Sequence, residues 1–324
     1  MKKVLAIGNA LVDMLIKLKD DNILNEFNLA KGSMQLSDMD LVEKITNKTK
    51  DLENHQASGG SAANTIHGLA HLNVETGFMG KIGNDELGSF FKNDMENKRI
   101  NTKLFLSNTP TGRAIALVSP DSERTFATYL GAAVELTEEE LYNDLFKGYD
   151  IFHVEGYLVQ NHQLLSTALK MAKENNLKVS LDLASFNVVE DNIDFLKDII
   201  NKYVDIIFAN EEEAKAYTGA DPKHALEMLA EQCEIAVVKV GEYGSMIKSK
   251  GNISTVESIS VHPLDTTGAG DLYAAGFLYG LINEYPLKKC GQIGAILGGK
   301  VIEGIGSKMT EDQWNEIHQM MNEL

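Results

Sequence analysis

The chain has 324 residues, 44% of them apolar and 24% charged, which is enough apolar material for one large core. Lys and Arg number 30 and Asp and Glu 47, so the formal net charge is −17. A charge of this sign repels phosphate backbones and anionic surfaces, which argues against nucleic acid or a membrane as a partner.

Secretion and membrane insertion are both disfavoured. Cys233 and Cys290 form no CxxC pair, so we expect neither a disulfide framework nor a cysteine-rich zinc site. The first residues, MKKVLAIGNALVDMLIKL, resemble a signal peptide only superficially, because Asn9 and Asp13 interrupt the apolar run. No window of about 18 apolar residues predicts a membrane span. We therefore expect a cytoplasmic protein that begins with a buried strand.

Short β-rich runs alternate with amphipathic helical patterns along most of the chain. The predicted strands cover 2–10, 75–83, 149–157, 177–185, 204–210 and 235–241. The predicted helices cover 61–72, 85–98, 162–176, 211–219 and 224–232. Such alternation is typical of βαβ units, so we expect an α/β fold with a mostly parallel sheet and helices on both faces.

Residues 28–37 and 109–130 break this alternation, because they contain strand-like runs and turns with no helix between them. We expect them to be antiparallel excursions that pair into a small sheet over the carboxyl edge of the main sheet, where α/β proteins bind ligands. With 5 prolines and no linker or repeat, the sequence predicts a single domain over 1–324. Its lid is expected to come from about 14–40 and 104–130.

The segment DTTGAGD, residues 265–271, stands directly before a helical pattern, LYAAGFLYGL. Gly268 and Gly270 allow backbone angles closed to other residues, and Ala269 adds little bulk, so successive N–H groups can converge on one point. They are also the unpaired donors of a helix's first turn, at the positive end of its dipole. We therefore expect the backbone of 268–271 to form an anion hole.

The acids of this segment need separate interpretations. Asp271 would repel an anion, so we expect it to be a general base that takes a proton from a hydroxyl attacking a phosphoryl group. Taken alone, the segment is more simply explained by an N-cap at Asp265 or Thr266 and a first-turn acid at Asp271. The rest of the chain has to decide between these interpretations.

Several further segments resemble the ribokinase-like (PfkB) family of carbohydrate and nucleoside kinases. DTTGAGDLYAAG is similar to the family's C-terminal signature, and ASGGSAANTIHGL, which contains Gly59, Gly60 and Asn64, to its N-terminal one. Other similar segments, in the family's order between about residues 4 and 306, are GNALVD at 8–13, GKIGNDELG at 80–88, NEEE at 210–213 and VKVGEYGS at 238–245.

Within that family the chain most resembles the adenosine kinase branch, through GNALVDM, NLAKGSMQL, PTGRAIAL, EGYLV and LDLASF. The resemblance implies a ribokinase-like three-layer α/β/α sandwich with a small β-rich lid. It also implies transfer of the γ-phosphoryl group of ATP, with Mg²⁺, to a primary hydroxyl of the acceptor. For a nucleoside this is the 5′-OH, and adenosine would give AMP.

The residues expected on the acceptor side are Asp13, Gly59, Gly60, Asn64, Tyr157 and Phe186. By resemblance, Asp13 follows the first strand and accepts hydrogen bonds from two acceptor hydroxyls, although a lone acid there is ordinarily a turn residue. Tyr157 and Phe186 follow strands and would stack on a planar base, which a simple sugar lacks; the alternative is that both belong to the core.

The residues expected on the ATP side are Asn210, Lys239, Gly241, Gly244 and Thr266. Glu213 matches the last position of the family's N-x-x-E and would hold Mg²⁺ through water, unless it is only a first-turn acid. Lys239 ends a valine run and could simply extend past the edge of the sheet. Arg113 and Arg124 lie in the expected lid, where they would either neutralise the transferred phosphoryl group or pair on the surface.

Two other nucleotide motifs are disfavoured. GAILGGKV at 294–301 fits a Walker A loop at Gly294, Gly299 and Lys300, but Val301 replaces the Ser or Thr that binds magnesium. We expect this segment to be a small-residue helix face packed on the helix after DTTGAGD. No G-x-G-x-x-G follows a strand, which argues against a dinucleotide-binding oxidoreductase.

The sequence therefore favours an ATP-dependent kinase with a nucleoside acceptor, adenosine first, and Asp265 as a structural or metal-adjacent residue. The alternatives are the same chemistry on a free sugar such as ribose or fructose and, more remotely, a non-catalytic nucleoside-binding protein on the same fold. The choice of purine, the need for a monovalent cation and the state as monomer or homodimer stay open.

Overall fold

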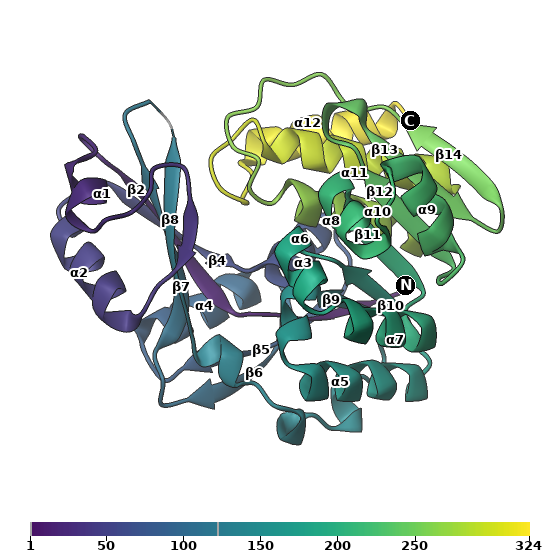
Figure 1. Ribbon diagram of the computed structural model, residues 1–324, viewed down its shortest axis with the longest axis horizontal. Helices are drawn as coiled ribbons and strands as arrows, with labels where there is room; N and C mark the ends of the chain where they lie inside the picture. Colours follow the sequence, from purple (N-terminus) through teal and green to yellow (C-terminus); the bar gives the residue numbers. More distant parts are fainter. Residues whose placement is uncertain (1, 122) are drawn as a thin grey trace.

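A computed structural model describes residues 2–121 and 123–324, which form two sheets (Figure 1). The large sheet has nine strands in the order β14-β13-β12-β11-β10-β9-β1-β5-β6. Its strands are β1 (Val4–Ile7), β5 (Thr76–Gly83), β6 (Asn101–Ser107), β9 (Ile151–Glu155), β10 (Lys178–Asp182), β11 (Ile206–Asn210), β12 (Ile235–Lys239), β13 (Ser245–Ser249) and β14 (Asn252–Val256). In this spatial order, the strands from β12 across to β6 pair in parallel with their neighbours. Strands β13 and β14 complete the sheet as antiparallel strands. The predicted mostly parallel sheet is confirmed.

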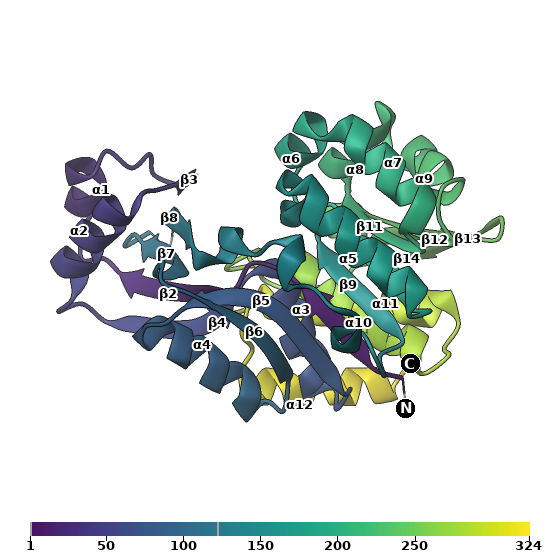
Figure 2. The same cartoon turned by 90° about the horizontal axis from the view of Figure 1, so that it is seen from below.

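Helices cover both faces of this sheet (Figure 2). One layer contains α3 (Ser61–His71), α4 (Glu86–Asn97), α10 (Ala269–Ile282), α11 (Leu287–Val301) and α12 (Glu311–Asn322). The other contains α5 (His162–Glu174), α6 (Phe186–Asp191), α7 (Ile193–Tyr203), α8 (Glu211–Thr218) and α9 (Pro222–Ala230). Strand β1 shows why two layers are needed, since Val4 and Ala6 join one core and Leu5 and Ile7 the other.

The small sheet has the order β3-β8-β7-β2-β4 and lies to the left in Figure 1. Its strands are β2 (Leu11–Lys17), β3 (Met34–Leu36), β4 (Asn54–Gly59), β7 (Thr111–Val118) and β8 (Arg124–Gly131), with α1 (Asn22–Glu26) and α2 (Met39–Thr49) beside them. One face of the sheet buries Val12, Met14 and Ile115 together with Val42 and Ile45 of α2. Along β2, buried residues alternate with less buried ones, as expected for a sheet packed on one face.

The strand-like stretches predicted to pair do so, but not as purely antiparallel excursions. β7 and β8 form the expected antiparallel hairpin, whereas β3 pairs with β8, and β2 with β7, in parallel. The small sheet also includes β2 and β4, so it takes strands from 11–59 and 111–131 rather than only from 14–40 and 104–130.

The first apolar run is where the prediction differs most from the structure. The run is divided into β1, in the large sheet, and β2, in the small sheet, with Gly8–Ala10 between them. Asp13 therefore lies within a strand of the small sheet and does not follow the first strand directly; that prediction is wrong. The carboxylate reaches the carboxyl edge of the large sheet from the small-sheet side.

Within the described ranges, no helix is long and apolar enough to cross a membrane. The expected packing of GAILGGKV is confirmed, because it lies inside α11 with its glycines against α10. A Cβ on Gly294 or Gly298 would lie 2.9 Å from the carbonyl oxygen of Tyr273 or Ala269.

Candidate active site

Helix α10 begins inside the DTTGAGD segment. Its N-cap is Gly268, at φ 78°, a left-handed conformation that favours glycine. The predicted N-cap at Asp265 or Thr266 is therefore wrong. The N–H of Ala269 donates to the Thr266 carbonyl oxygen at 3.2 Å, while those of Gly268, Gly270 and Asp271 have no acceptor within the described part of the chain. We refer to these three N–H groups, unpaired donors at the positive end of the helix, as the anion hole; that they bind an anion stays a prediction.

Asp271 stands in the first turn of α10 and is held by two side chains of α3. Oγ of Ser61 donates to Oδ1 of Asp271 at 2.7 Å, and Nδ2 of Asn64 donates to Oδ2 at 2.9 Å. Burial raises the pKa of Asp271, while the bonds from Asn64 and Ser61 lower it in opposition. The carboxylate is thus fixed in direction and made more basic than a solvated aspartate.

A half-buried lysine lies beside these N–H groups. Lys239 ends β12, and its ammonium lies 3.0 Å from the position that a Cβ on Gly270 would take. Nζ of Lys239 donates to Oδ2 of Asp182, at the end of β10, at 3.1 Å. Burial acts to lower the pKa of Lys239, but the charges of Asp182 and Glu213 outweigh it, so the pKa is raised and the amine stays protonated. The protein therefore holds a positive charge beside these N–H groups.

Asn210 and Glu213 form a reciprocal capping box at the start of α8. The backbone N–H and Nδ2 of Asn210 donate to the two carboxylate oxygens of Glu213 at 2.8 and 2.7 Å. Burial, and then the charge of Asp182, raise the pKa of Glu213. The interpretation of Glu213 as a first-turn acid is confirmed, and Glu213 is also a buried acid close to Lys239 and Asp182. Its role in holding Mg²⁺ stays a prediction.

Asp13 faces the same region from the small sheet. A Cβ on Gly59, its neighbour on β4, would overlap with the Asp13 carboxylate, so glycine is required for this close approach. Within residues 2–121 and 123–324 no group hydrogen-bonds to that carboxylate. Burial raises its pKa to about 6, with the Lys308 charge lowering it and the Asp271 charge raising it. Asp13 is therefore a half-buried acceptor with no hydrogen-bond donor from the described residues.

The turn between β4 and α3 is fixed by a second buried carboxylate. Gly60, at φ 99°, is the N-cap of α3. Glu155, at the end of β9, accepts from the N–H and Nδ2 of Asn9 at 2.9 and 2.7 Å and from the N–H of Ala62 at 3.0 Å. Asn9 precedes β2, so Glu155 holds two of the places where the chain crosses between the sheets.

The aromatic residues lie after strands, as expected. Tyr157 follows β9 and is 36% exposed, and Phe186 opens α6 and is 43% exposed, so neither is a core residue. Burial, and then the charges of Glu155 and Asp271, raise the pKa of Tyr157 to about 12. Gly241 and Gly244 form the turn between β12 and β13, beyond Lys239.

The two lid arginines differ. Arg124 of β8 contacts the Asp265 carboxylate and donates from Nη2 to the carbonyl oxygen of Leu264 at 2.8 Å. Arg113 lies on the opposite face of the small sheet, in register with Val12. Against burial, the hydrogen bonds from Thr111 and Gly88 lower the pKa of Asp85, and the Arg113 charge adds to them. Asp265 itself accepts from the N–H groups of Thr267 and Gly306, so its role is structural.

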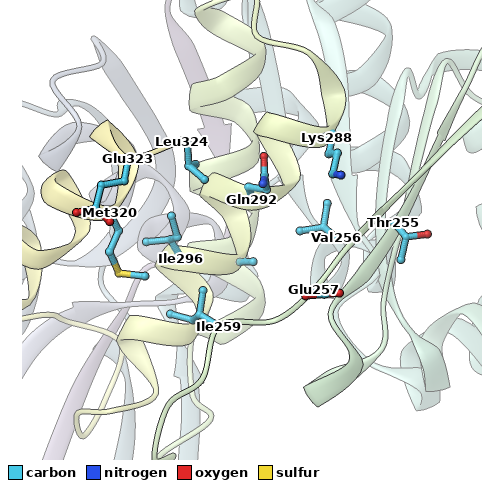
Figure 3. A pocket seen from close by; sticks show the side chains of 11 residues that line it. Thr255, Val256, Glu257, Ile259, Lys288, Gln292, Ile296, Met320, Glu323 and Leu324 are labelled. Carbon is cyan, nitrogen blue, oxygen red and sulfur yellow. The ribbon is translucent and has the colours of Figure 1, made fainter.

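A cavity of about 530 Å³ lies between β14, α11 and α12 (Figure 3). Its walls include Val256, Glu257 and Ile259 on one side and Gln292 and Ile296 of α11 on another. The same helix packs against the start of α10 at Gly298. The cavity and the start of α10 therefore border different faces of the same helix, α11.

Sequence reasoning missed five residues of this site: Ser61, Glu155, Asp182, Ser307 and Lys308. The first three lie inside segments that carried the family resemblance, where their chemistry could have drawn attention. The last two belong to the loop between α11 and α12, for which the sequence offers only a glycine-containing turn. Lys308 reaches Oδ1 of Asn64 at 3.1 Å.

Comparison with known proteins agrees with this geometry. Residues 26–313 match the model of the pfkB family of carbohydrate kinases. The crystal structure of adenosine kinase from Sinorhizobium meliloti has a TM-score of 0.87 and 33% identity, covering 98% of this chain and 99% of that one. A probable sugar kinase from Rhizobium etli has a TM-score of 0.87 and 31% identity, covering 98% of both chains.

A curated relative lies in the same family. A sugar kinase of Archaeoglobus fulgidus, itself uncharacterized, is 29% identical over 243 residues, covering 74% of this chain and 96% of its own. The fold, the anion hole at the start of α10 and these matches agree with one another. The chain belongs to the pfkB family of carbohydrate kinases and is a phosphotransferase that acts on the hydroxyl group of a sugar or a nucleoside.

Proposed function

We propose that the protein transfers the γ-phosphoryl group of ATP to the 5′-hydroxyl of a nucleoside, with adenosine as the favoured acceptor and AMP as the product. The observation that carries this proposal is the position of Asp271. Its carboxylate is held by Ser61 and Asn64 at the edge of the anion hole. It is close enough to Asp13 for its charge to act on that residue.

Asp271 is the proposed general base. As the acceptor oxygen forms its bond to the γ-phosphorus, the bond from that phosphorus to the bridging oxygen of ADP breaks, and the hydroxyl proton passes to Asp271. The N–H groups of Gly268, Gly270 and Asp271 and the Lys239 ammonium stabilise the negative charge on the phosphoryl oxygens. A raised pKa makes Asp271 a better proton acceptor.

The acceptor side follows from Asp13. Its two oxygens have no partner within the described residues, and a vicinal diol would supply a donor to each. Gly59 and Gly60 let the backbone approach the ribose closely, and Asn64 offers its amide. A nucleoside and a sugar share this diol, so the ribose subsite does not by itself select between them.

The choice of a nucleoside rests on large apolar and aromatic side chains that are exposed to solvent. Tyr157 and Phe186 are 36% and 43% exposed, and Met34 and Leu36 of β3 are 59% and 63% exposed. Burying such surfaces against a planar base is favourable, and a simple sugar has no flat apolar face to offer. The likeness to the adenosine kinase of Sinorhizobium meliloti supports the same choice.

ATP would lie along α11. We place its purine in the cavity beside Gln292 and Ile296 and its phosphates at the start of α10, where Gly298 of α11 packs. Asn210, Gly241, Gly244 and Thr266 border this path at the ends of β11 and β12 and before α10.

The residues present fit a magnesium ion that arrives with ATP. No group of three His, Cys, Asp or Glu among the described residues could hold an ion alone, and Mg²⁺ ordinarily keeps several waters and binds substrate phosphates. Glu213, with Asp182 near it, would hold such an ion through water, since both its oxygens already accept from Asn210. When bound, the ion neutralises charge on the phosphates.

The small sheet would act as a lid that excludes water, so that ATP is not hydrolysed in place of the acceptor. Its inner face carries Asp13, Arg124 and the exposed residues of β3. Arg124 lies near enough to the DTTGAGD segment to contact Asp265, from which it could turn to the phosphoryl group on closure.

The test is a panel of acceptors with ATP and Mg²⁺, scored by ADP release. Adenosine, inosine, guanosine and cytidine are compared with ribose, fructose and a sugar acid, and kcat/KM for the best nucleoside should exceed that for every free sugar. A higher kcat/KM for a sugar would support the second candidate, a sugar kinase like that of Rhizobium etli. No ADP release with any acceptor, combined with a raised Tm in adenosine, would support a non-catalytic nucleoside-binding protein.

A further inference from the structure

The loop between α11 and α12 reaches the proposed base through one asparagine. Oγ of Ser307 donates to Oδ1 of Asn64 at 2.8 Å, and Nζ of Lys308 donates to the same oxygen at 3.1 Å. Nδ2 of Asn64 donates to Oδ2 of Asp271 at 2.9 Å. The loop is thus linked to the base without touching it.

These two donors determine which way the Asn64 amide faces. An amide has a donor end and an acceptor end of nearly the same shape. With two donors at one end, the oxygen of Asn64 belongs there, and the NH₂ group is turned to Asp271. The reversed amide would place its oxygen against a carboxylate and its NH₂ against Ser307 and Lys308, leaving buried polar groups unpaired.

The loop is also fastened to the segment that forms the anion hole. The N–H groups of Leu264 and Asp265 donate to the carbonyl oxygen of Ile302, and the N–H of Gly306 donates to the Asp265 carboxylate at 2.6 Å. A Cβ on Gly268 would lie 2.8 Å from Cβ of Ser307. The loop, the anion hole and Asn64 therefore form one connected unit.

Lys308 brings a charge into this unit. The charged groups that act on its ammonium are Asp13 of β2, Asp94 and Lys98 of the α4 region and Asp271 of α10. The charge of Lys308 also acts on His67 and His71 of α3. Burial lowers the pKa of Lys308 to about 8, with Asp13 the first of the charges that oppose this. The Lys308 charge in turn favours the ionised form of Asp13, against burial and the charge of Asp271.

We propose that Ser307 and Lys308 are positioning residues for phosphoryl transfer: together they hold the Asn64 amide toward Asp271, and the Lys308 ammonium, bound to the far end of that amide, adds a positive charge that acts on the carboxylates of Asp271 and Asp13. This inference rests on the proposed function of Asp13 and Asp271. The two effects are separable, because Ser307 contributes only the first and Lys308 contributes both.

The test compares Lys308→Met, Lys308→Arg, Ser307→Ala and the control Lys98→Met, using the best acceptor of the panel between pH 5 and 9. Loss of a nearby charge should shift the acid limb of kcat/KM in Lys308→Met upward by roughly half a pH unit or more. The acceptor KM should rise about tenfold, as for loss of a charged hydrogen-bonding partner. Lys308→Arg should restore the acid limb.

Ser307→Ala should lower kcat by about threefold to tenfold, the loss of one hydrogen bond, with the acid limb unmoved. Lys98→Met removes a charge from the same region without touching Asn64 and should leave both constants within about twofold. A structural role alone would lower Tm without moving the acid limb.

The inference is overturned if Lys308→Met folds with the Tm of the wild type and keeps its acid limb and acceptor KM. It is equally overturned if Lys98→Met shifts the limb as far as Lys308→Met. If Lys308→Met does not fold, Ser307→Ala and Lys308→Arg test the proposal instead. An unchanged kcat in Ser307→Ala together with a shifted acid limb in Lys308→Arg would contradict it. Failure of the wild type to release ADP with any acceptor would instead overturn the proposed function itself.

Discussion

The guanidinium of Arg124, on β8 of the small sheet, contacts the carboxylate of Asp265, which begins the DTTGAGD segment. The pair is nearly enclosed, with 11% of the Arg124 side chain and 3% of that of Asp265 exposed. Because Asp265 also accepts from the backbone of Thr267 and Gly306, the contact joins the small sheet to the frame of the anion hole. The position of the small sheet and the geometry of the phosphate site are therefore coupled.

Replacing Arg124 with Gln should weaken this coupling. Hydrogen bonds to charged groups contribute about 1.5–3 kcal/mol, so we expect kcat to fall about tenfold to a hundredfold. Amide exchange in β7 and β8 should become faster, which hydrogen-exchange mass spectrometry would detect. Lys31→Gln is the control, because Lys31 pairs with Asp21 and Asp121 near the tip of the small sheet. Equal exchange and turnover in both variants would show that the contact with Asp265 holds nothing in place.

Gly270→Ala should weaken ATP binding through Lys239. The new Cβ would lie 3.0 Å from Nζ, so the ammonium must move away from the anion hole. We expect the KM for ATP to rise about tenfold, the loss of one charged interaction, with acceptor KM unchanged. Gly304→Ala is the control for glycine replacement, since Gly304 has no left-handed φ and its added Cβ would lie 3.6 Å from the nearest atom, in the side chain of Gln313. An ATP KM equal to that of the wild type would separate Lys239 from the phosphate site.

The pH dependence of stability should reveal Glu155. Burial raises the pKa of this carboxyl from 4.5 to about 7, so the folded state binds its proton more tightly than the unfolded chain does. The sign follows from linkage: this group's contribution is most favourable below pH 4.5 and falls as the pH rises to about 7. The loss amounts to roughly 3 kcal/mol, as an order of magnitude.

Urea unfolding of the wild type and Glu155→Gln between pH 4.5 and 8 measures this effect. The altered hydrogen bonds to Asn9 and Ala62 lower the unfolding free energy of the variant by an amount that does not depend on pH. Because the variant does not titrate, the difference in unfolding free energy, variant minus wild type, should increase as the pH rises. Glu174→Gln, at the exposed end of α5, should give a curve parallel to the wild type. A parallel curve for Glu155→Gln would mean that Glu155 is ionised in both states over this range.

Local patterns were sufficient to predict the central parallel strands of the large sheet and most of the helices beside them, but not β6, β13 and β14 or helices α6, α7 and α12. The predicted strands are short and mostly buried runs, and some of the helices have a capping signal, such as Asn210 with Glu213 before α8. The small sheet was harder to predict, because β2 follows β1 after only three residues and continues the same apolar run. Nothing local marks the place where a chain leaves one sheet for another. Asp13 was consequently placed on the wrong element although its position in the site was expected.

In the candidate site, too, local features could be predicted and contacts between distant residues could not. DTTGAGD is informative because a helix start with small residues has a direct physical consequence, and the structure has α10 begin there. The supports of that segment come from residues distant in sequence, with Ser61 separated from Asp271 by 210 positions and Ser307 from Asn64 by 243. Only the folded chain brings such residues together, so Ser307 and Lys308 had no signal in a single sequence.

Asp271→Asn tests the chemistry most directly. The variant keeps the shape of the side chain but loses the basic oxygen pair, so turnover should fall by about a hundredfold to ten-thousandfold, the usual contribution of a general base. ATP affinity, measured by calorimetry, should change little, because the N–H groups of the anion hole and Lys239 are retained. Ser61→Ala is the matched comparison, since it removes one hydrogen bond to Oδ1 and leaves the carboxylate. It should lose only about threefold to tenfold in kcat, as for a single hydrogen bond. If both variants lost turnover equally, or if Asp271→Asn kept it, proton transfer to Asp271 would not be part of the reaction, and the acceptor hydroxyl would have to lose its proton to another group.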